Sequence, residues 1–415
     1  SDVADDSVTT AKIADDAVTA DKLANSINTE IAANTAKTGI SSAQTTKLSG
    51  IETSATADQT TAEIKAHVTL QTSATSNIGL GTGAVDSITT GDYNVGLGDN
   101  AGTAITSGAN NTALGYQALQ STTSAQDVTA IGFKSLQANT TGTGTAVGEA
   151  SLYSNTTGTD NTAIGRQALY NNTTAANNTA VGRSALMANT TGAQNVAVGF
   201  ESLKAHTTSN DCTTVGWQSQ LATTTGIANT SLGAGSLRTI TTQNGNTAIG
   251  VASQYISAAS DNTSVGYETL RYNTSGANNT SVGKSALHQN TTASNNTALG
   301  FYALAANTTG ANNVAVGALS LRDNTTAGDN VSIGDSAMLV NTTGAYNVAV
   351  GSQALDANST GQNNTAIGRI SLTDNTTGSD NTAVGSNSLV NNTTGTRNTG
   401  VGHRAMENLD TGTNN

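Results

Sequence analysis

The histidines and the single cysteine are the residues of this chain that metal or nucleophilic chemistry would use first. The four histidines stand in unrelated settings, without a carboxylate or cysteine at ligand spacing: His67, His206, His288 and His403. Cys212 replaces an asparagine of a repeat, so we expect a tolerated small buried residue. No catalytic triad, phosphate-binding loop or calcium-binding repeat occurs. The sequence therefore predicts no metal, no cofactor and no enzymatic activity.

Aromatic side chains recur at one position, directly after a periodic glycine. They are Tyr116, Phe133, Phe200, Trp217, Tyr267 and Phe301. Because the chain is expected to turn at that glycine, these rings should project from the surface. Aromatic rings can stack on sugars, which makes this column a candidate contact surface for a surface polysaccharide. The alternative interpretation is partial burial of the rings between repeats or between chains.

The composition excludes several classes of protein. The 415 residues include no proline, 3% aromatic and 11% charged residues, which is unlike ordinary globular domains. No apolar run is long enough for a membrane span, and one cysteine cannot build a disulfide framework. A net charge of −12 argues against binding to a nucleic-acid backbone. Composition alone would favour disorder, but a strict repeat indicates order.

A 17-residue repeat accounts for most of the sequence. One glycine recurs nineteen times between residues 94 and 415, with two steps of 16 among steps of 17. The residue before it is Val, Ile or Leu, the one before that is small, and asparagine opens most units. A leucine or methionine usually follows four residues after the glycine. These columns are illustrated by Asn161, Gly165, Asn178, Val181, Gly182 and Leu186.

The columns predict an all-β fold, a parallel β-solenoid or β-roll of 17-residue coils. Asn-(Thr/Val)-small-(Val/Ile/Leu) favours a short strand that ends at the glycine, and we assign the small-Leu pair to a second short strand. Asn-Thr-Thr-Gly is typical of a turn. Nineteen coils stacked about 4.8 Å apart would form a rod of roughly 90 Å. The repeated asparagines are expected to form an amide ladder along it.

Both faces of the predicted strand are restricted in residue type. The Thr/Val and Val/Ile/Leu columns share one face, and the asparagine and small columns share the other. The columns after the glycine vary freely, so recent duplication does not explain the restriction. A strand restricted on both faces is expected to be buried on both sides. We therefore expect the small-residue face to pack against identical chains, as in a homotrimeric fibre.

The chain before residue 94 lacks the 17-residue repeat. Residues 1–24 contain the tandem decads ADDSVTTAKI and ADDAVTADKL, which predict a thin shaft. Residues 25–70 carry widely spaced isoleucines and leucines and are expected to form a stalk with short coiled-coil helices. Residues 71–93 are assigned to a transition, and residues 94–415 to the solenoid.

Several of these segments resemble known proteins. The decads VADDSVTTAKIADDAVTADKLA and the NTAVG…AL…NTTG units resemble parts of bacteriophage tail-fibre proteins. The Asn-Thr-Ala-Val-Gly core is similar to the β-roll heads of trimeric autotransporter adhesins. The resemblance implies a homotrimeric structural fibre in the virion. Its N-terminal side would attach to phage tail or baseplate proteins, and the rod would reach toward a receptor or glycan on the host surface.

Two other functions stay open at this point. A bacterial extracellular trimeric adhesin or surface filament would share the repeat, but would need an anchor at the cell surface. An ice-binding β-solenoid would use the doubled threonines, such as Thr173 with Thr174 and Thr190 with Thr191. Neighbouring residues on a strand point in opposite directions, whereas flat ice-binding faces favour alternating threonines.

Overall fold

The computed structural model describes residues 68–69 and 76–415, and every regular element among them is a β-strand. The chain divides into two units, Ser1–Ala66 and His67–Asn415. The expected thin shaft (1–24) and nearly all of the expected stalk (25–70) lie outside the described residues. The described part contains no helix with the length and hydrophobicity needed to cross a bilayer.

The strands are short, and each lies one coil after the previous one. The first ten after the initial two-residue strand β1 (Val68–Thr69) are β2 (Ile78–Leu80), β3 (Val95–Leu97), β4 (Thr112–Leu114), β5 (Thr129–Ile131), β6 (Gly144–Val147), β7 (Asn161–Ile164), β8 (Thr179–Val181), β9 (Val196–Val198), β10 (Thr213–Val215) and β11 (Thr230–Leu232). The remainder are β12 (Thr247–Ile249), β13 (Thr263–Val265), β14 (Thr280–Val282), β15 (Thr297–Leu299), β16 (Val314–Val316), β17 (Val331–Ile333), β18 (Val348–Val350), β19 (Thr365–Ile367), β20 (Thr382–Val384) and β21 (Thr399–Val401).

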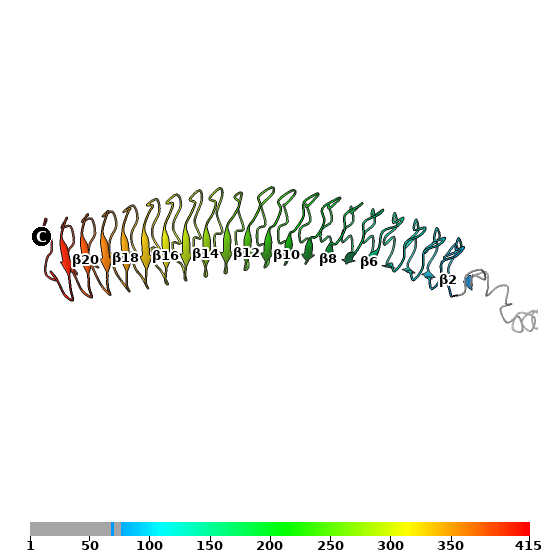
Figure 1. Ribbon diagram of the computed structural model, residues 1–415, viewed down its shortest axis with the longest axis horizontal. Helices are drawn as coiled ribbons and strands as arrows, with labels where there is room; N and C mark the ends of the chain where they lie inside the picture. Colours follow the sequence, from blue (N-terminus) through cyan, green and yellow to red (C-terminus); the bar gives the residue numbers. More distant parts are fainter. Residues whose placement is uncertain (1–67, 70–75) are drawn as a thin grey trace, which may run out of the picture. The chain divides into compact units, whose positions relative to one another are not determined.

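From β2 onward, every strand pairs in parallel with the next, with equivalent residues opposite each other. In the β8–β9 pair, Ala180 lies opposite Ala197, and Val181 lies opposite Val198. The coils of unit His67–Asn415 therefore stack into a gently curved rod with all strands along one side (Figure 1). The predicted all-β parallel solenoid of 17-residue coils is confirmed.

The stack begins one coil before residue 94. Strand β2 pairs in parallel with β3, and the Asn77 side-chain oxygen accepts a hydrogen bond from the Asn94 amide at 2.8 Å. The segment 71–93, which the sequence assigned to a transition, thus contains a full coil. Strand β1 runs antiparallel to β2 and covers its free edge, which protects the backbone there from other pairing.

The small-residue face of each strand is buried inside its own coil. Ala180 and Leu186 are both fully buried within a single chain, and together such pairs form the apolar core. The expectation that neighbouring chains cover the small-residue face was therefore wrong. The coil closes on itself, so the leucine of the opposite wall covers that face. The outward face carries the Thr/Val and Val/Ile/Leu columns.

The wall opposite the strand is a series of turns, and the predicted second strand was also wrong. Ser184 and Leu186 adopt left-handed conformations, with φ of 56° and 52°, which an extended strand does not allow. The backbone is still bonded from coil to coil here, because the Leu186 amide donates to the Ser202 carbonyl at 3.0 Å. The hydrophobic leucine is placed inward by a turn rather than by strand alternation.

The repeated glycine is required by both backbone conformation and stacking. Gly182 has a φ of +133°, which strongly favours glycine. A Cβ atom at this position would lie 2.5 Å from the carbonyl oxygen of Gly199 in the next coil. The equivalent glycine of the preceding coil, Gly165, has a similar φ, and a Cβ there would meet the backbone of Gly182 just as closely. A side chain at any glycine of this column that has a further coil stacked on it would push the two coils apart.

Asparagines form two buried ladders along the rod. In the first, the Asn161 side-chain oxygen accepts from the Asn178 amide at 3.0 Å, and Asn178 does the same for Asn195. In the second, the Asn189 side-chain nitrogen donates to the Asn172 side-chain oxygen at 2.9 Å. The expected amide ladder is present. The asparagine side chains form hydrogen bonds with backbone groups at the turns, which have no strand partner.

We predict that Gly182→Ala lowers the melting temperature of the rod considerably more than Gly402→Ala does. Both positions have φ above +120°, but a Cβ at Gly402, in the last coil, meets nothing within 4 Å. The comparison separates the stacking clash from the backbone strain of about 1–3 kcal/mol that both variants share. Thermal unfolding followed by circular dichroism measures the effect. Equal losses in the two variants would show that stacking does not require the glycine.

Candidate functional site

The six aromatic residues singled out in the sequence lie on the outside of the rod. Trp217 and Tyr267 are about half exposed, at 51% and 50%. Tyr116 stacks on Phe133 of the next coil, with ring centroids 5.5 Å apart and an interplanar angle of 15°. The expectation that this column projects from the turn is confirmed. Five of the six rings are exposed and Phe200 is partly buried in the single chain, and several of them also contact neighbours along the rod.

Cations accompany these rings, a feature that the sequence interpretation missed. The Lys284 ammonium lies 6.0 Å from the ring centroid of Tyr267 and 5.8 Å from that of Phe301. The Arg183 guanidinium lies 5.6 Å from the centroid of Phe200. These distances are within the range of a cation–π interaction. The signal in the sequence was the alternation of basic and aromatic residues within the column after the glycine.

A second column, five residues after the glycine, extends this arrangement into a continuous cluster. Arg238 lies 5.5 Å from the Trp217 ring and 5.4 Å from the Tyr255 ring, and Arg271 lies 5.7 Å from Tyr255. Arg271 also stacks on Tyr272, whose ring meets His288 edge-on at 5.1 Å. We call these six residues the aromatic–arginine strip: Trp217, Arg238, Tyr255, Arg271, Tyr272 and His288.

The two arginines of the strip differ in their charge balance. Arg271 forms an ion pair with Glu268, whose other oxygen lies 3.7 Å from His288. Burial lowers the pKa of His288, and Glu268 opposes this effect. Arg238 instead bonds to the Tyr255 hydroxyl and has no carboxylate partner among the described residues. Its positive charge is therefore uncompensated at the surface.

Beneath the strip, polar residues replace part of the apolar interior of the rod. Gln220 and Gln254 occupy positions that hold leucine in most coils, and both are fully buried. The Gln220 side-chain nitrogen donates to Ser231 at 3.0 Å, but the side-chain oxygens of both glutamines have no partner. The apolar core is divided at these coils into separate clusters, the small middle one built around Leu237. A buried polar atom without a partner costs stability.

The second asparagine ladder is interrupted over the same coils. Its positions are filled by His206, Thr223, Ile240 and Ser257, so the side-chain oxygen of Asn189 has no partner. These four residues are all buried, and three of them carry polar atoms without partners. Coils 206–257 thus combine an irregular interior with the first half of the strip on their outside.

The remaining histidines and the cysteine form no common site. The His206 ring bonds to the Ser209 carbonyl at 2.7 Å, His403 is exposed in the last coil, and His67 lies outside the described residues. Cys212 is fully buried, as expected, and burial raises the pKa of its thiol. Within the described part of the chain, no group of three potential metal ligands comes together.

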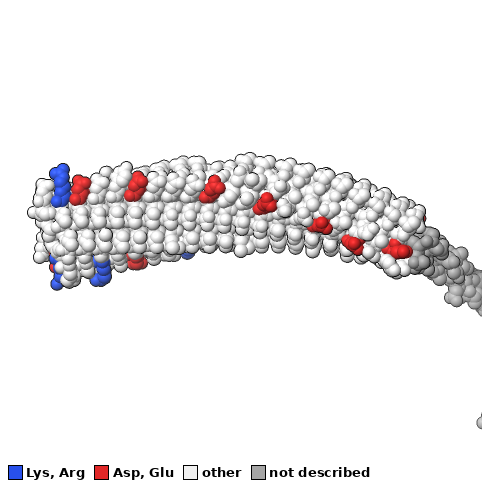
Figure 2. All heavy atoms as spheres, viewed as in Figure 1, with Lys and Arg blue, Asp and Glu red and all other residues white. Residues whose placement is uncertain are grey.

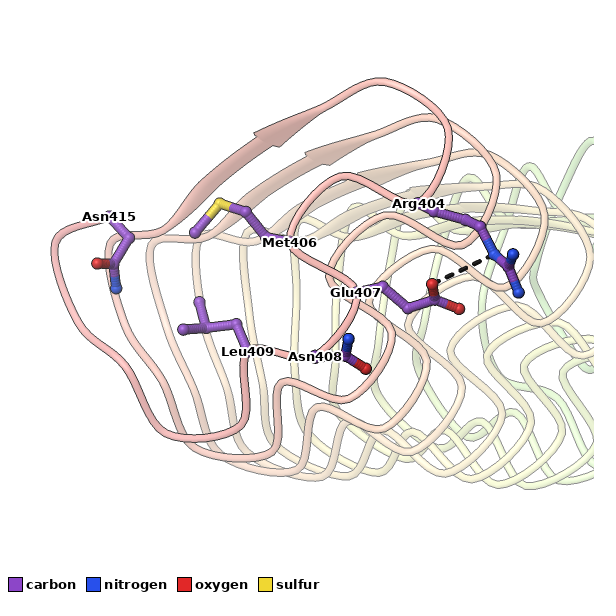
Figure 3. A pocket seen from close by; sticks show the side chains of 6 residues that line it. All are labelled: Arg404, Met406, Glu407, Asn408, Leu409 and Asn415. Atoms are coloured by element: carbon purple, nitrogen blue, oxygen red, sulfur yellow. Dashed lines mark ion pairs between the residues drawn. The ribbon is translucent and has the colours of Figure 1, made fainter.

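The C-terminal end of the stack has an open hollow of about 480 Å³. Its lining includes Met406 and Leu409, which cover the end of the apolar core, and an ion pair between Arg404 and Glu407 at 3.2 Å (Figure 3). The two apolar side chains take the places that leucine and asparagine hold in earlier coils. The hollow is the end face of the last coil rather than an enclosed site.

Apart from Glu268, which pairs with Arg271, no acidic side chain among the described residues forms an ion pair with the strip. Figure 2 shows acidic side chains as a sparse row along one face of the rod, separated by uncharged surface. Aspartates recur five residues before the glycine, and an asparagine of the preceding coil donates to three of them. Examples are Asn110 to Asp127 at 3.0 Å and Asn312 to Asp329 at 3.1 Å. One column of negative charge therefore lies at a position of the coil other than that of the aromatic rings.

The doubled threonines are engaged within the rod. The Thr173 hydroxyl donates to the Thr190 carbonyl at 3.1 Å, and the Thr190 hydroxyl donates to the Thr207 carbonyl at 3.1 Å. The second threonine of each pair is exposed at the turn. The doubled threonines therefore contribute one free column at the turns, and a separate threonine column, which includes Thr213 and Thr230, is exposed on the sheet face.

No protein-family model matches the chain, and no curated protein is detectably similar to it. The described surface of the rod offers two features: an apolar sheet face and the aromatic–arginine strip. Both are suited to binding rather than to bond-making chemistry.

We predict that the rod loses stability as the pH falls from 7 to 5, and that His206→Asn reduces this loss. Burial holds the pKa of His206 below its usual value of 6.5. Below that pH the unfolded chain binds a proton that the folded chain excludes, so acidification favours unfolding. Urea unfolding at both pH values measures the difference.

Thr223→Asn is the matched control. It also restores an asparagine to the interrupted ladder, but removes no titratable group, so its effect should be the same at pH 7 and pH 5. If His206→Asn retains the full pH dependence of the original chain, the histidine is not its source.

Proposed function

We propose that the protein is a structural fibre of a bacteriophage virion, a homotrimeric tail fibre whose rod reaches toward the host cell surface. The observation that carries the proposal is the unbroken aliphatic column on the outward sheet face of a long parallel solenoid. The likeness of the repeats and of the N-terminal decads to tail-fibre segments supports the same conclusion. In this reading the N-terminal side attaches to tail or baseplate proteins.

The outward face of the sheet supports self-association. The residue before each glycine points outward, and nine such side chains are between 39% and 68% exposed, among them Leu97, Leu232 and Val401. The column is Val, Ile or Leu in every coil and contains no charged residue. A row of aliphatic side chains along the whole rod far exceeds the apolar patch of an ordinary soluble monomer.

A second copy of the chain is the partner that fits this face best. The aliphatic column repeats once per coil, about every 4.8 Å. Only a partner with the same period can cover it without losing register, and an identical chain has that period. A closed arrangement of three parallel copies would bring the three apolar faces to one axis. Closure also prevents open-ended aggregation through the same face.

We predict that the double variant Val181→Glu with Val198→Glu weakens the trimer. Each glutamate would meet its copies at the axis, where burial of unpaired charge is strongly unfavourable. The molar mass of the unsubstituted protein, measured by light scattering, should correspond to three chains. The protein concentration below which the variant dissociates should be at least about tenfold higher than that of the unsubstituted protein. Thr174→Glu with Thr191→Glu is the control, because it adds equal charge at exposed turns of the same coils. A stable single chain in solution would overturn the trimer.

The location of the protein is tested on assembled particles. Immunogold electron microscopy with antibodies to the two ends of the chain should label tail-attached fibres, with the N-terminal label at the tail. Labelling of bacterial cell surfaces without particles would favour the adhesin or filament instead. The absence of label on virions would remove the fibre assignment.

A further inference from the structure

We infer that the aromatic–arginine strip is a binding site for a carboxylate-bearing polysaccharide that lies along the rod. The inference rests on the proposed function, in which the rod approaches a host surface. The strip supplies two complementary kinds of contact, the half-exposed Trp217 ring with its partly buried aromatic neighbours and a stacked guanidinium, Arg238, without an acidic partner. The first suits the apolar faces of sugar rings, and the second suits carboxylates.

The geometry of the strip favours an extended ligand. Its residues come from successive coils, from Trp217 through Tyr255 to His288, so contacts repeat about every 4.8 Å along the axis. This step is comparable to one sugar unit of an extended polysaccharide. Tyr267, Lys284 and Phe301 continue the same kind of surface in the neighbouring column. A compact ligand would use only one or two of these positions.

The charge distribution selects an acidic ligand over a neutral one. Arg238, Arg183 and Lys284 have no ion-pair partner among the described residues, although the chain carries a net charge of −12. Stacking between Trp217 and Tyr255 holds the Arg238 guanidinium in place, so little side-chain freedom is lost on binding. A planar, fixed guanidinium is well suited to a two-point contact with a carboxylate.

Access to the strip is compatible with the proposed trimer. The strip residues follow the glycine turn, whereas the aliphatic column precedes it on the sheet. Trp217 is 51% exposed, and the Arg271 and Glu268 side chains are 29% and 22% exposed. The polysaccharide would therefore lie beside the sheet face rather than on it.

The test measures binding of polygalacturonate oligosaccharides to the full chain by calorimetry, with their methyl-esterified counterparts as the neutral probe. We expect the acidic probe to bind and the esterified probe to bind at least about tenfold more weakly. Arg238→Gln should weaken binding of the acidic probe by at least about tenfold, and Trp217→Ala should weaken binding of both probes. Arg397→Gln is the matched control, because it removes one exposed cation that has no aromatic or acidic partner among the described residues.

Three results would overturn the inference. They are no binding of the acidic probe, equal binding of both probes, and an equal loss in Arg238→Gln and Arg397→Gln, which would indicate non-specific attraction. Circular dichroism melting confirms that the variants are folded. The molar mass in solution, measured on the same samples, distinguishes a failure of the binding site from a failure of the trimeric fibre. A trimer that binds no acidic probe refutes the site alone, and a binding-competent single chain refutes the trimeric fibre alone.

Discussion

The structure depends on the bonding of each coil to the next along the whole circumference. Equivalent residues lie directly over one another, as Ala180 does with Ala197, so every position must tolerate a copy of itself at about 4.8 Å. Glycine satisfies this where the backbones nearly touch, and asparagine does so because an amide can donate and accept in the same direction. Like charges do not, which explains why only 11% of the residues are charged.

The same constraint produces a very thin core. Two small residues and one leucine per coil, such as Ala180, Ala185 and Leu186, make up most of the apolar interior, and the larger aliphatic residue of the strand is turned outward. Most proteins bury their Val, Ile and Leu side chains first. Here the narrow coil holds the leucine of the turn but not the Val, Ile or Leu residue of the strand. The width of the coil therefore determines how much apolar surface is available for assembly. The proposed trimer follows from this division between inside and outside.

The period, the parallel strands, the turn at the glycine and the exposure of Trp217 could all be predicted from the sequence, because each is a column property. The turn that takes the place of the expected second strand could not be predicted, because Leu186 faces inward from a left-handed conformation whose φ of 52° is atypical for leucine. The closure of each coil on its own small-residue face was missed for the same reason. The contacts of Arg238 were missed because its column varies freely, and free variation was interpreted as an absence of constraint.

The irregular interior of coils 206–257 is explained by the one-dimensional character of a solenoid. Each coil contacts only its neighbours, so a buried Gln220 or His206 destabilises a short stretch without affecting the distant coils. A globular core would spread the same cost over the whole domain. The strip begins on the outside of these coils, with Trp217 and Arg238 over the interruptions. A rod built from many equivalent coils can therefore carry a locally weakened, chemically distinct segment while the regular coils on both sides maintain the stack.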